Sequence, residues 1–109
     1  ELLKEIEKVK KIHVSDRVKE YIVTLVEGIR KREFVRLGPS PRASIWLFKG
    51  ARARAYLQGR DYVIPDDVKA LAPHVLSHRI ILTPEAEMED ISQNDVIQEA
   101  LRETPVKKE

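Results

Sequence analysis

One arginine occupies an unusual place for its charge. Arg42 follows the turn sequence Gly38-Pro39-Ser40-Pro41, and an apolar, alanine-containing helix is expected after it. The pattern predicts Ser40 as the N-cap and Pro41 at the first helical position, where its missing N–H costs nothing. A helix start carries unpaired N–H groups and about half a positive charge, so a cation there costs several tenths of a kcal/mol, up to about 1. A bound phosphate would remove the conflict, because it accepts hydrogen bonds from both the guanidinium and the helix end.

The spacing alone leaves a second interpretation of Arg42 open. Most surface charges are simply solvated, and a small dipole cost is screened by salt. Arg42 could equally pair with a carboxylate from another part of the chain. Neither alternative needs a ligand.

Other residue patterns with chemical potential have structural explanations. His74 and His78 are four residues apart, as in half of a zinc pair, but the chain has no cysteine and Pro73, just before His74, disturbs the helix geometry. We therefore expect packing or interface histidines and no metal site. Asp66 and Asp67 begin a predicted helix, and the helix dipole accounts for both without a general acid–base pair.

A group of basic residues lies around the arginine. Five cations fall within thirteen positions, opposed only by Glu33: Arg30, Lys31, Arg32, Arg36 and Arg42. Such a cluster suits nucleic acid, but Phe34 is the only aromatic residue that interleaves with it, and charge at a helix end explains most of it. Three further arginines are interpreted as solvated or paired: Arg52, Arg54 and Arg60.

Length and composition indicate what kind of domain carries these residues. The 109-residue chain is 42% hydrophobic and 35% charged with a net charge of +2, which predicts one small globular domain. The absence of cysteine excludes a disulfide framework and a thiolate metal site and fits a cytoplasmic protein. No apolar run reaches the roughly 20 residues that span a bilayer, and no signal peptide is seen. Because a helical pattern starts at once without a cap, we expect a piece of a longer protein.

Hydrophobic periodicity predicts an all-α fold, a small bundle of four to five helices with strands minor at most. Helices are expected over 2–10, about 16–32, about 41–58 with Gly59 as the C′ residue, from 65 onward, and after the N-cap Ser92 with Asp95 in a capping box. Residues 33–39 are expected to form a loop. The helix over 16–32 should bury an apolar stripe: Val18, Tyr21, Ile22, Leu25, Val26 and Ile29. Pro73 predicts a kink or break near Ala72. A ridge of small side chains spaced by four residues should let another helix approach closely: Ala43, Leu47, Ala51 and Ala55. We expect a folded domain over 1–104 and a flexible tail over 105–109. Trp46 is left open between core and interface.

The sequence around Arg42 resembles a known segment. LGPSPRAS at 37–44 is similar to the Gly-Ala-Ser-Pro-Arg-Ala segment in the C-terminal helical lid of the MoxR-type AAA+ ATPases. The resemblance extends in order over nearly the whole chain, through VSDRVKEYIVTLVEGIR (14–30), GRDYVIPDDVKALAPHVLSHRIIL (59–82) and LTPEAEMEDISQNDVIQEAL (82–101). Two departures are visible: Pro39 replaces the commoner alanine, and Ile64 stands where a Ser or Thr cap is usual.

This resemblance implies a role for each residue of the turn. The lid would close over ATP held by an absent N-terminal ATPase domain, and Arg42 would be the sensor-2 arginine that reaches the γ-phosphate. Ser40 and Pro41 would position it. The implied partners are the chain's own ATPase domain, neighbouring subunits of a ring that is usually a hexamer, and by analogy a von Willebrand A domain protein in metal insertion or complex maturation.

The missing motifs limit what this chain does by itself. It contains no G-x-x-x-x-G-K-[ST] phosphate loop, so ATP and Mg²⁺ would be held by the parent and no catalytic residue is expected here. The fragment alone should not hydrolyse ATP, and we predict no metal ligand and no contact with membrane. The alternative is a free-standing helical module that binds nucleic acid or protein.

Overall fold

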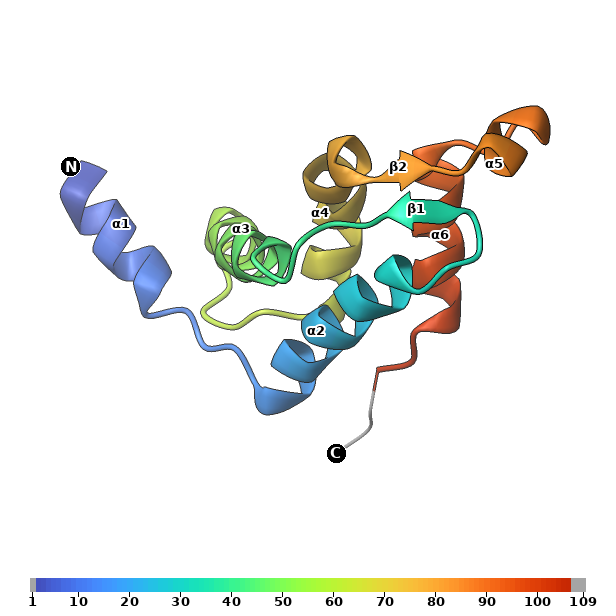
Figure 1. The fold of residues 1–109 in the computed structure, drawn as a ribbon. Helices are drawn as coiled ribbons and strands as arrows, with labels where there is room; N and C mark the ends of the chain where they lie inside the picture. Colours follow the sequence, from blue (N-terminus) through green and yellow to red (C-terminus); the bar gives the residue numbers. More distant parts are fainter. Residues whose placement is uncertain (1, 107–109) are drawn as a thin grey trace.

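The computed structural model describes residues 2–106, and Figure 1 shows mostly helices arranged around one core. The elements in chain order are α1 (Leu2–Lys10), α2 (Asp16–Arg30), β1 (Val35–Leu37), α3 (Ala43–Leu57), α4 (Pro65–Leu76), the 3₁₀ turn η1 (Ser77–Arg79), β2 (Ile81–Leu82), α5 (Pro84–Met88) and α6 (Gln93–Glu103). The all-α class is therefore confirmed. No helix within residues 2–106 is both long and apolar enough to cross a bilayer.

The second helix follows its sequence pattern closely. Ser15 is its N-cap, with the hydroxyl oxygen accepting a hydrogen bond from the Val18 N–H at 3.3 Å. The predicted apolar stripe is buried: Val18, Tyr21, Ile22, Leu25, Val26 and Ile29. The helix ends at Arg30, slightly earlier than predicted.

Helices α3 and α4 form the most closely packed pair in the core. The predicted small-residue ridge of α3 is fully buried, and so are Val68, Ala72 and Leu76 of α4. A Cβ atom added at Gly50 would lie 3.1 Å from Leu71 Cδ1, which shows how near the helices come. The ridge therefore acts as predicted.

Gly59 ends α3 as predicted. Its φ of +78° favours glycine, and the Arg60 N–H donates to the Ala55 carbonyl at 2.9 Å while the Gly59 N–H donates to the Tyr56 carbonyl at 3.0 Å. These two bonds make a Schellman motif.

Pro73 does not end α4. Of the kink or break predicted near Ala72, the break does not occur, because the helix continues through Pro73 to Leu76. The proline leaves the Lys69 carbonyl without its usual helical partner, but Lys69 is exposed, so water can hydrate that group. Burial of Ala72 and Leu76 on either side favours continuation.

A small antiparallel sheet and a short helix complete the fold. Val35 pairs with Leu82 and Leu37 with Ile81 in the β1–β2 sheet, although the sequence predicted a loop over 33–39. The short helix α5 was not predicted. Ser92 caps α6 as expected, and Asp95 and Ser92 exchange hydrogen bonds of 2.9 and 3.1 Å in a capping box.

The two ends of the chain differ in packing. Helix α1 forms as predicted but buries none of its described residues, and Figure 1 shows it at one edge of the molecule, on the side of α3. In the segment predicted as a tail, Pro105 is exposed and Val106 packs against the core. The rest of that segment, 107–109, lies outside the described residues.

Candidate functional site

Arg42 lies on an exposed face at the start of α3. Its backbone is helical (φ −61°, ψ −23°), and it occupies the cap position that the sequence assigned to Ser40. The chain enters the helix through a tight turn, in which the Ala43 N–H donates to the Ser40 carbonyl at 2.9 Å and the Ser44 N–H to the Pro41 carbonyl at 3.0 Å. This turn uses N–H groups that the sequence interpretation left free, so the regular helix begins later than predicted.

The side chain of Arg42 has no partner among residues 2–106, either as a hydrogen bond or as an ion pair. The first turn of α3 also contains no acidic residue. Each of the other described α-helices has at least one acid there: Glu5 in α1, Asp16 in α2, Asp66 and Asp67 in α4, Glu85 and Glu87 in α5, and Asp95 in α6. Helix α3 thus departs from the pattern of its own fold, and carboxylate pairing of Arg42 within residues 2–106 is ruled out.

The turn before Arg42 is held against the end of α2. Pro39 is fully buried. A Cβ atom on Gly38 would lie 2.8 Å from Arg30 Cγ and 2.9 Å from Arg30 Cα, so only glycine allows this approach. Pro39 therefore anchors the turn in the core and helps to fix the position of Arg42.

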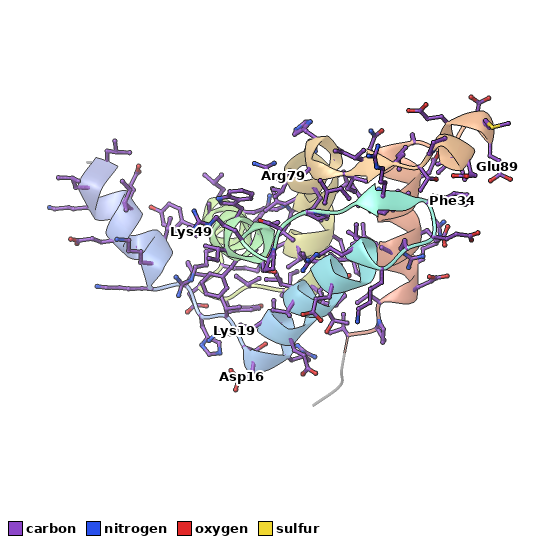
Figure 2. The ribbon with its side chains drawn as sticks, viewed as in Figure 1. Asp16, Lys19, Phe34, Lys49, Arg79 and Glu89 are labelled. Atoms are coloured by element: carbon purple, nitrogen blue, oxygen red, sulfur yellow. The ribbon has the colours of Figure 1, made fainter. Side chains whose placement is uncertain are left out.

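Trp46 lies one helical turn after Arg42. It is 38% exposed, and the guanidinium carbon of Arg79 lies 4.2 Å from the centroid of its ring. Residues four apart share a helix face, so Arg42 and the Trp46–Arg79 stack lie on one side of α3. Figure 2 shows Arg79 projecting from the turn after α4. Nothing in the sequence linked Arg79 to α3, because the two are far apart along the chain.

Exposed apolar residues neighbour both members of this stack, either along the chain or through the β1–β2 sheet. Ile45, next to Trp46, is 51% exposed, and the paired strand residues Leu37 and Ile81 are 60% and 50% exposed. With Arg42 and Arg79 they form the sensor face: Leu37, Arg42, Ile45, Trp46, Arg79 and Ile81. An exposed face that combines apolar groups with unpaired cations suits contact with another protein surface that carries negative charge.

Arg54 and Arg60 both donate hydrogen bonds to one buried acid, Asp67. Asp67 is fully buried and accepts hydrogen bonds from Arg60 at 2.6 and 2.8 Å, from Arg54 at 2.7 Å and from the Ile64 N–H at 2.9 Å. The interpretation of Asp67 as a dipole residue alone is therefore incomplete. Its carboxylate also supplies the helix-start contact that Ile64 lacks a side chain to make, and it ties α3 to α4.

The environment of Asp67 has opposing effects on its pKa. Burial raises the pKa, whereas the hydrogen bonds from Arg60, the Ile64 N–H and Arg54 lower it and prevail. Asp67 is therefore charged in the folded protein. The side-chain hydrogen bond with Asp67 in turn raises the pKa of Arg60.

The basic cluster is divided by structure. Arg32 forms ion pairs with Glu99 at 2.7 Å and Glu103 at 2.5 Å and so joins the segment after α2 to α6. Arg36 and Arg42 stay exposed and unpaired among the described residues. His74 and His78 are both exposed, so neither packs in the core. Residues 2–106 contain no cluster of three or more potential metal ligands.

Comparison with known proteins identifies the fold that carries Arg42. The AAA lid domain family matches residues 27–100, most of the chain. The chain belongs to the AAA lid domain family. Its lid is 47% identical over 93 residues to the uncharacterized protein YeaC of Bacillus subtilis, covering 85% of this chain and 29% of that protein. It is 41% identical over 92 residues to the chaperone MoxR1 of Mycobacterium tuberculosis, covering 76% of this chain and 24% of that protein.

A solved structure confirms the shape of the lid. A protein of Cytophaga hutchinsonii, whose assignment as an ATPase is provisional, superposes with a TM-score of 0.88 at 36% identity, covering 94% of this chain and 34% of that one. These relatives confirm the predicted family, the lid of a MoxR-type AAA+ ATPase. The lid spans about a quarter to a third of the length of these proteins.

Proposed function

We propose that this lid closes over ATP and Mg²⁺ held by the ATPase domain of its parent, with Arg42 contacting the γ-phosphate. The observation that supports the proposal is the isolation of Arg42: an exposed cation at the one described α-helix whose first turn lacks an acid. A terminal phosphate fits this position, because it accepts from a guanidinium and favours the positive end of a helix. ATP and Mg²⁺ supply the phosphoryl chemistry when bound, and no residue of the lid is catalytic.

The neighbours of Arg42 would fix its aim. Ser40 and Pro41 would act as positioning residues, because the Ser40 and Pro41 carbonyls accept the hydrogen bonds that shape the turn. Buried Pro39 and the Gly38–Arg30 contact connect this turn to α2. Attraction between Arg42 and a γ-phosphate would therefore move the whole lid toward the nucleotide. Loss of the γ-phosphate would let the lid move away again.

The sensor face gives the lid a surface for its own ATPase domain. Its apolar side chains would be covered when the lid closes, while its cations would face negative charge. We further propose that the parent is a cytoplasmic ATPase that forms a ring, usually a hexamer in this family. A chaperone-like role with a von Willebrand A domain partner follows by analogy alone.

Turnover by the full-length parent tests the assignment. Arg42→Ala should lower kcat for ATP about 10- to 100-fold, the size expected for loss of a hydrogen bond between charged groups. Arg36→Ala is the matched control, since Arg36 is also exposed and unpaired among the described residues but lies on β1. Equal activity of both variants and the wild type would remove Arg42 from the site.

The alternative, a free-standing nucleic-acid module, is distinguished by salt. Binding to phosphates would weaken steeply as salt rises and would depend on Arg36 as much as on Arg42. The pairing of Arg32 with α6 leaves fewer free cations for such a surface.

A further inference from the structure

One end of the lid carries an acidic projection. Helix α5 and the turn after it contain four exposed acids within six positions, and Met88 among them is 86% exposed. Asp90 has a φ of 57°, which ends α5 abruptly and turns the chain back toward α6. Figure 1 shows α5 at the far edge of the molecule, and Figure 2 shows Glu89 there. We call this projection the acidic knob: Glu85, Glu87, Met88, Glu89 and Asp90.

The acidic knob has no electrostatic partner within the described part of the chain. None of its four carboxylates forms an ion pair or a side-chain hydrogen bond among residues 2–106. A methionine exposed to this degree contributes nothing to the core, but its flexible, polarizable side chain adapts well to a partner's apolar surface.

The opposite end of the lid carries a groove of complementary character. It lies between α1 and α3 and has a volume of about 650 Å³. Its walls are mainly apolar: Leu2, Ile6, Val9, Phe48, Ala53, Tyr56 and Leu57. Its rim is mainly basic, with Lys10, Lys49 and Arg52, and Glu5 is the one acid. We call it the α1–α3 groove. Leu2 and Leu57 are 70% and 80% exposed, so the lid does not fill this space itself.

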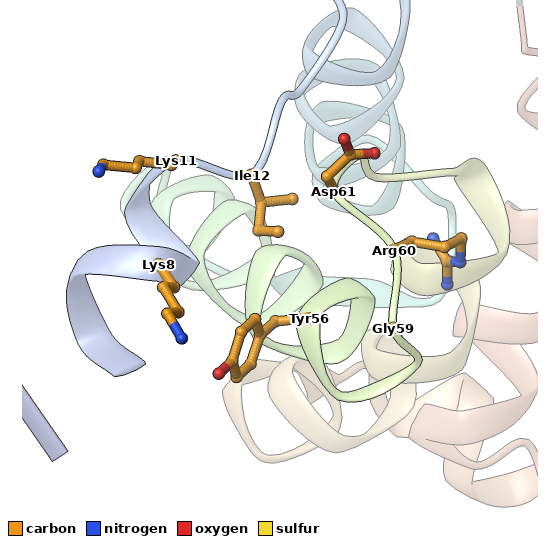
Figure 3. A pocket seen from close by; sticks show the side chains of 7 residues that line it. All are labelled: Lys8, Lys11, Ile12, Tyr56, Gly59, Arg60 and Asp61. Carbon is orange, nitrogen blue, oxygen red and sulfur yellow. The ribbon is translucent and has the colours of Figure 1, made fainter. Parts of the chain in front are cut away.

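A second hollow continues the basic end. It has a volume of about 560 Å³ and shares Tyr56 with the α1–α3 groove. Figure 3 shows Lys8 beside Tyr56, with Lys11 close by on the same end of the lid. Neither lysine has an ion-pair partner among the described residues. Lys8 and Lys11 therefore add positive charge beside the groove, and Asp61 is the one acid that lines this second hollow.

We propose that the acidic knob of one copy docks into the α1–α3 groove of a second copy. Met88 would enter the apolar groove, and the flanking acids would meet Lys10 and Lys49 on its rim. The two surfaces cannot meet within one molecule, because they lie at opposite ends of a body 49 Å long. Charge complementarity and the match of a projection with a concavity favour a copy of this chain as the occupant.

The contact would be head to tail, so each copy would use both of its ends. Such a contact generates a closed ring or an open chain, whereas a two-fold contact ends at a dimer. The proposal concerns contacts between lids and does not depend on Arg42, which lies at the other end of α3 from Leu57.

Engineered disulfides test the contact directly, because the chain contains no cysteine. Met88→Cys and Ala53→Cys place one thiol in the acidic knob and one in the α1–α3 groove. A mixture of the two variants should form the cross-linked dimer at least tenfold faster than Met88→Cys mixed with Leu37→Cys, an exposed position on the sensor face. Equal rates, or faster cross-linking of Ala53→Cys with itself, would overturn the proposal.

Sedimentation of the 109-residue chain gives an independent test. Its average mass should rise with concentration up to about 1 mM, the range expected for a small interface, and should fall when salt is raised from 50 to 500 mM. Met88→Asp and Leu57→Asp should each be monomeric, but their mixture should form 1:1 dimers, since one variant keeps its groove and the other its knob. A chain that stays monomeric throughout, or a Met88→Asp variant that associates like the wild type, would contradict the contact.

Discussion

Arg79 covers the Trp46 ring at a distance of 4.2 Å, and so links the turn after α4 to the exposed face of α3. Arg79 also donates a hydrogen bond to the Val75 carbonyl at 2.6 Å, which orients its guanidinium group. The stack therefore holds Trp46 beside Arg42 in a fixed position. Trp46 therefore lies on the surface with its ring partly covered by Arg79.

Removing Arg79 should loosen this face without unfolding the lid. Arg79→Ala is expected to destabilise the isolated lid by about 0.5–1 kcal/mol, the value of an exposed cation–π pair. Trp46 is the single tryptophan of the chain, so its fluorescence reports on the change without ambiguity. Its emission should shift to longer wavelength as water reaches the ring. Arg79→Lys serves as the control and should keep part of the effect; identical spectra for all three proteins would exclude the stack in solution.

The buried carboxylate should matter far more to stability. Asp67→Asn would leave Arg54 and Arg60 facing a neutral group and weaken the contact to the Ile64 N–H. Because both arginines keep some exposure to water, we expect a loss of about 2–3 kcal/mol, below the value for a fully buried pair. Urea unfolding measures it, with Asp66→Asn as the matched control at the exposed neighbouring position. A loss below about 0.5 kcal/mol would show that the cluster contributes little.

The lowered pKa of Asp67 predicts how stability depends on pH. The unfolded carboxyl titrates near 3.9, and the folded one titrates below that. Its contribution is therefore complete above about pH 4 and is lost as pH falls through the folded pKa. Urea unfolding between pH 2 and 6 should show stability decreasing in this window. Asp67→Asn should flatten the curve, leaving a smaller slope from Asp95, whose pKa is lowered by hydrogen bonds with Ser92. An unchanged slope would contradict the assignment.

Gly38 should be required for the position of the turn that precedes Arg42. Gly38→Ala would force its Cβ atom to within 2.9 Å of the Arg30 backbone, which cannot move easily inside α2. We expect a loss of about 1–3 kcal/mol in unfolding free energy. Gly28→Ala is the control, because nothing lies within 4 Å of its added Cβ atom and alanine favours a helix by about 1 kcal/mol. The two substitutions should therefore change stability in opposite directions, and a neutral Gly38→Ala would show that the turn can shift.

The sequence predicted the features that depend on residues close together in the chain. The stripe of α2, the small-residue ridge of α3, the Gly59 end and the Ser92–Asp95 cap each depend on residues within one helical turn or two, and all are confirmed. The break predicted at Pro73 does not occur, because burial of the flanking Ala72 and Leu76 outweighs the local preference of proline against a helix interior.

Features that depend on distant partners were not predictable from spacing. The β1–β2 pairs, the Arg79–Trp46 stack and the joining of Arg32 to α6 each connect residues that no sequence period relates. Asp67 was interpreted by its place at a helix start, although its burial comes from α3 and α4 together. For Arg42 the sequence left pairing with a carboxylate open, and no such pair forms among residues 2–106. The tight turn that positions Arg42 appears only in three dimensions.

The affinity of the full-length parent for a slowly hydrolysed ATP analogue, compared with its affinity for ADP, tests the role of Arg42 most directly. If Arg42 contacts the γ-phosphate, Arg42→Ala should weaken binding of the analogue about 10- to 100-fold and leave ADP binding unchanged. The same substitution should stabilise the isolated lid by a few tenths of a kcal/mol, up to about 1, since it removes a cation from a positive helix end. Equal losses for both nucleotides, or no loss for either, would contradict the account.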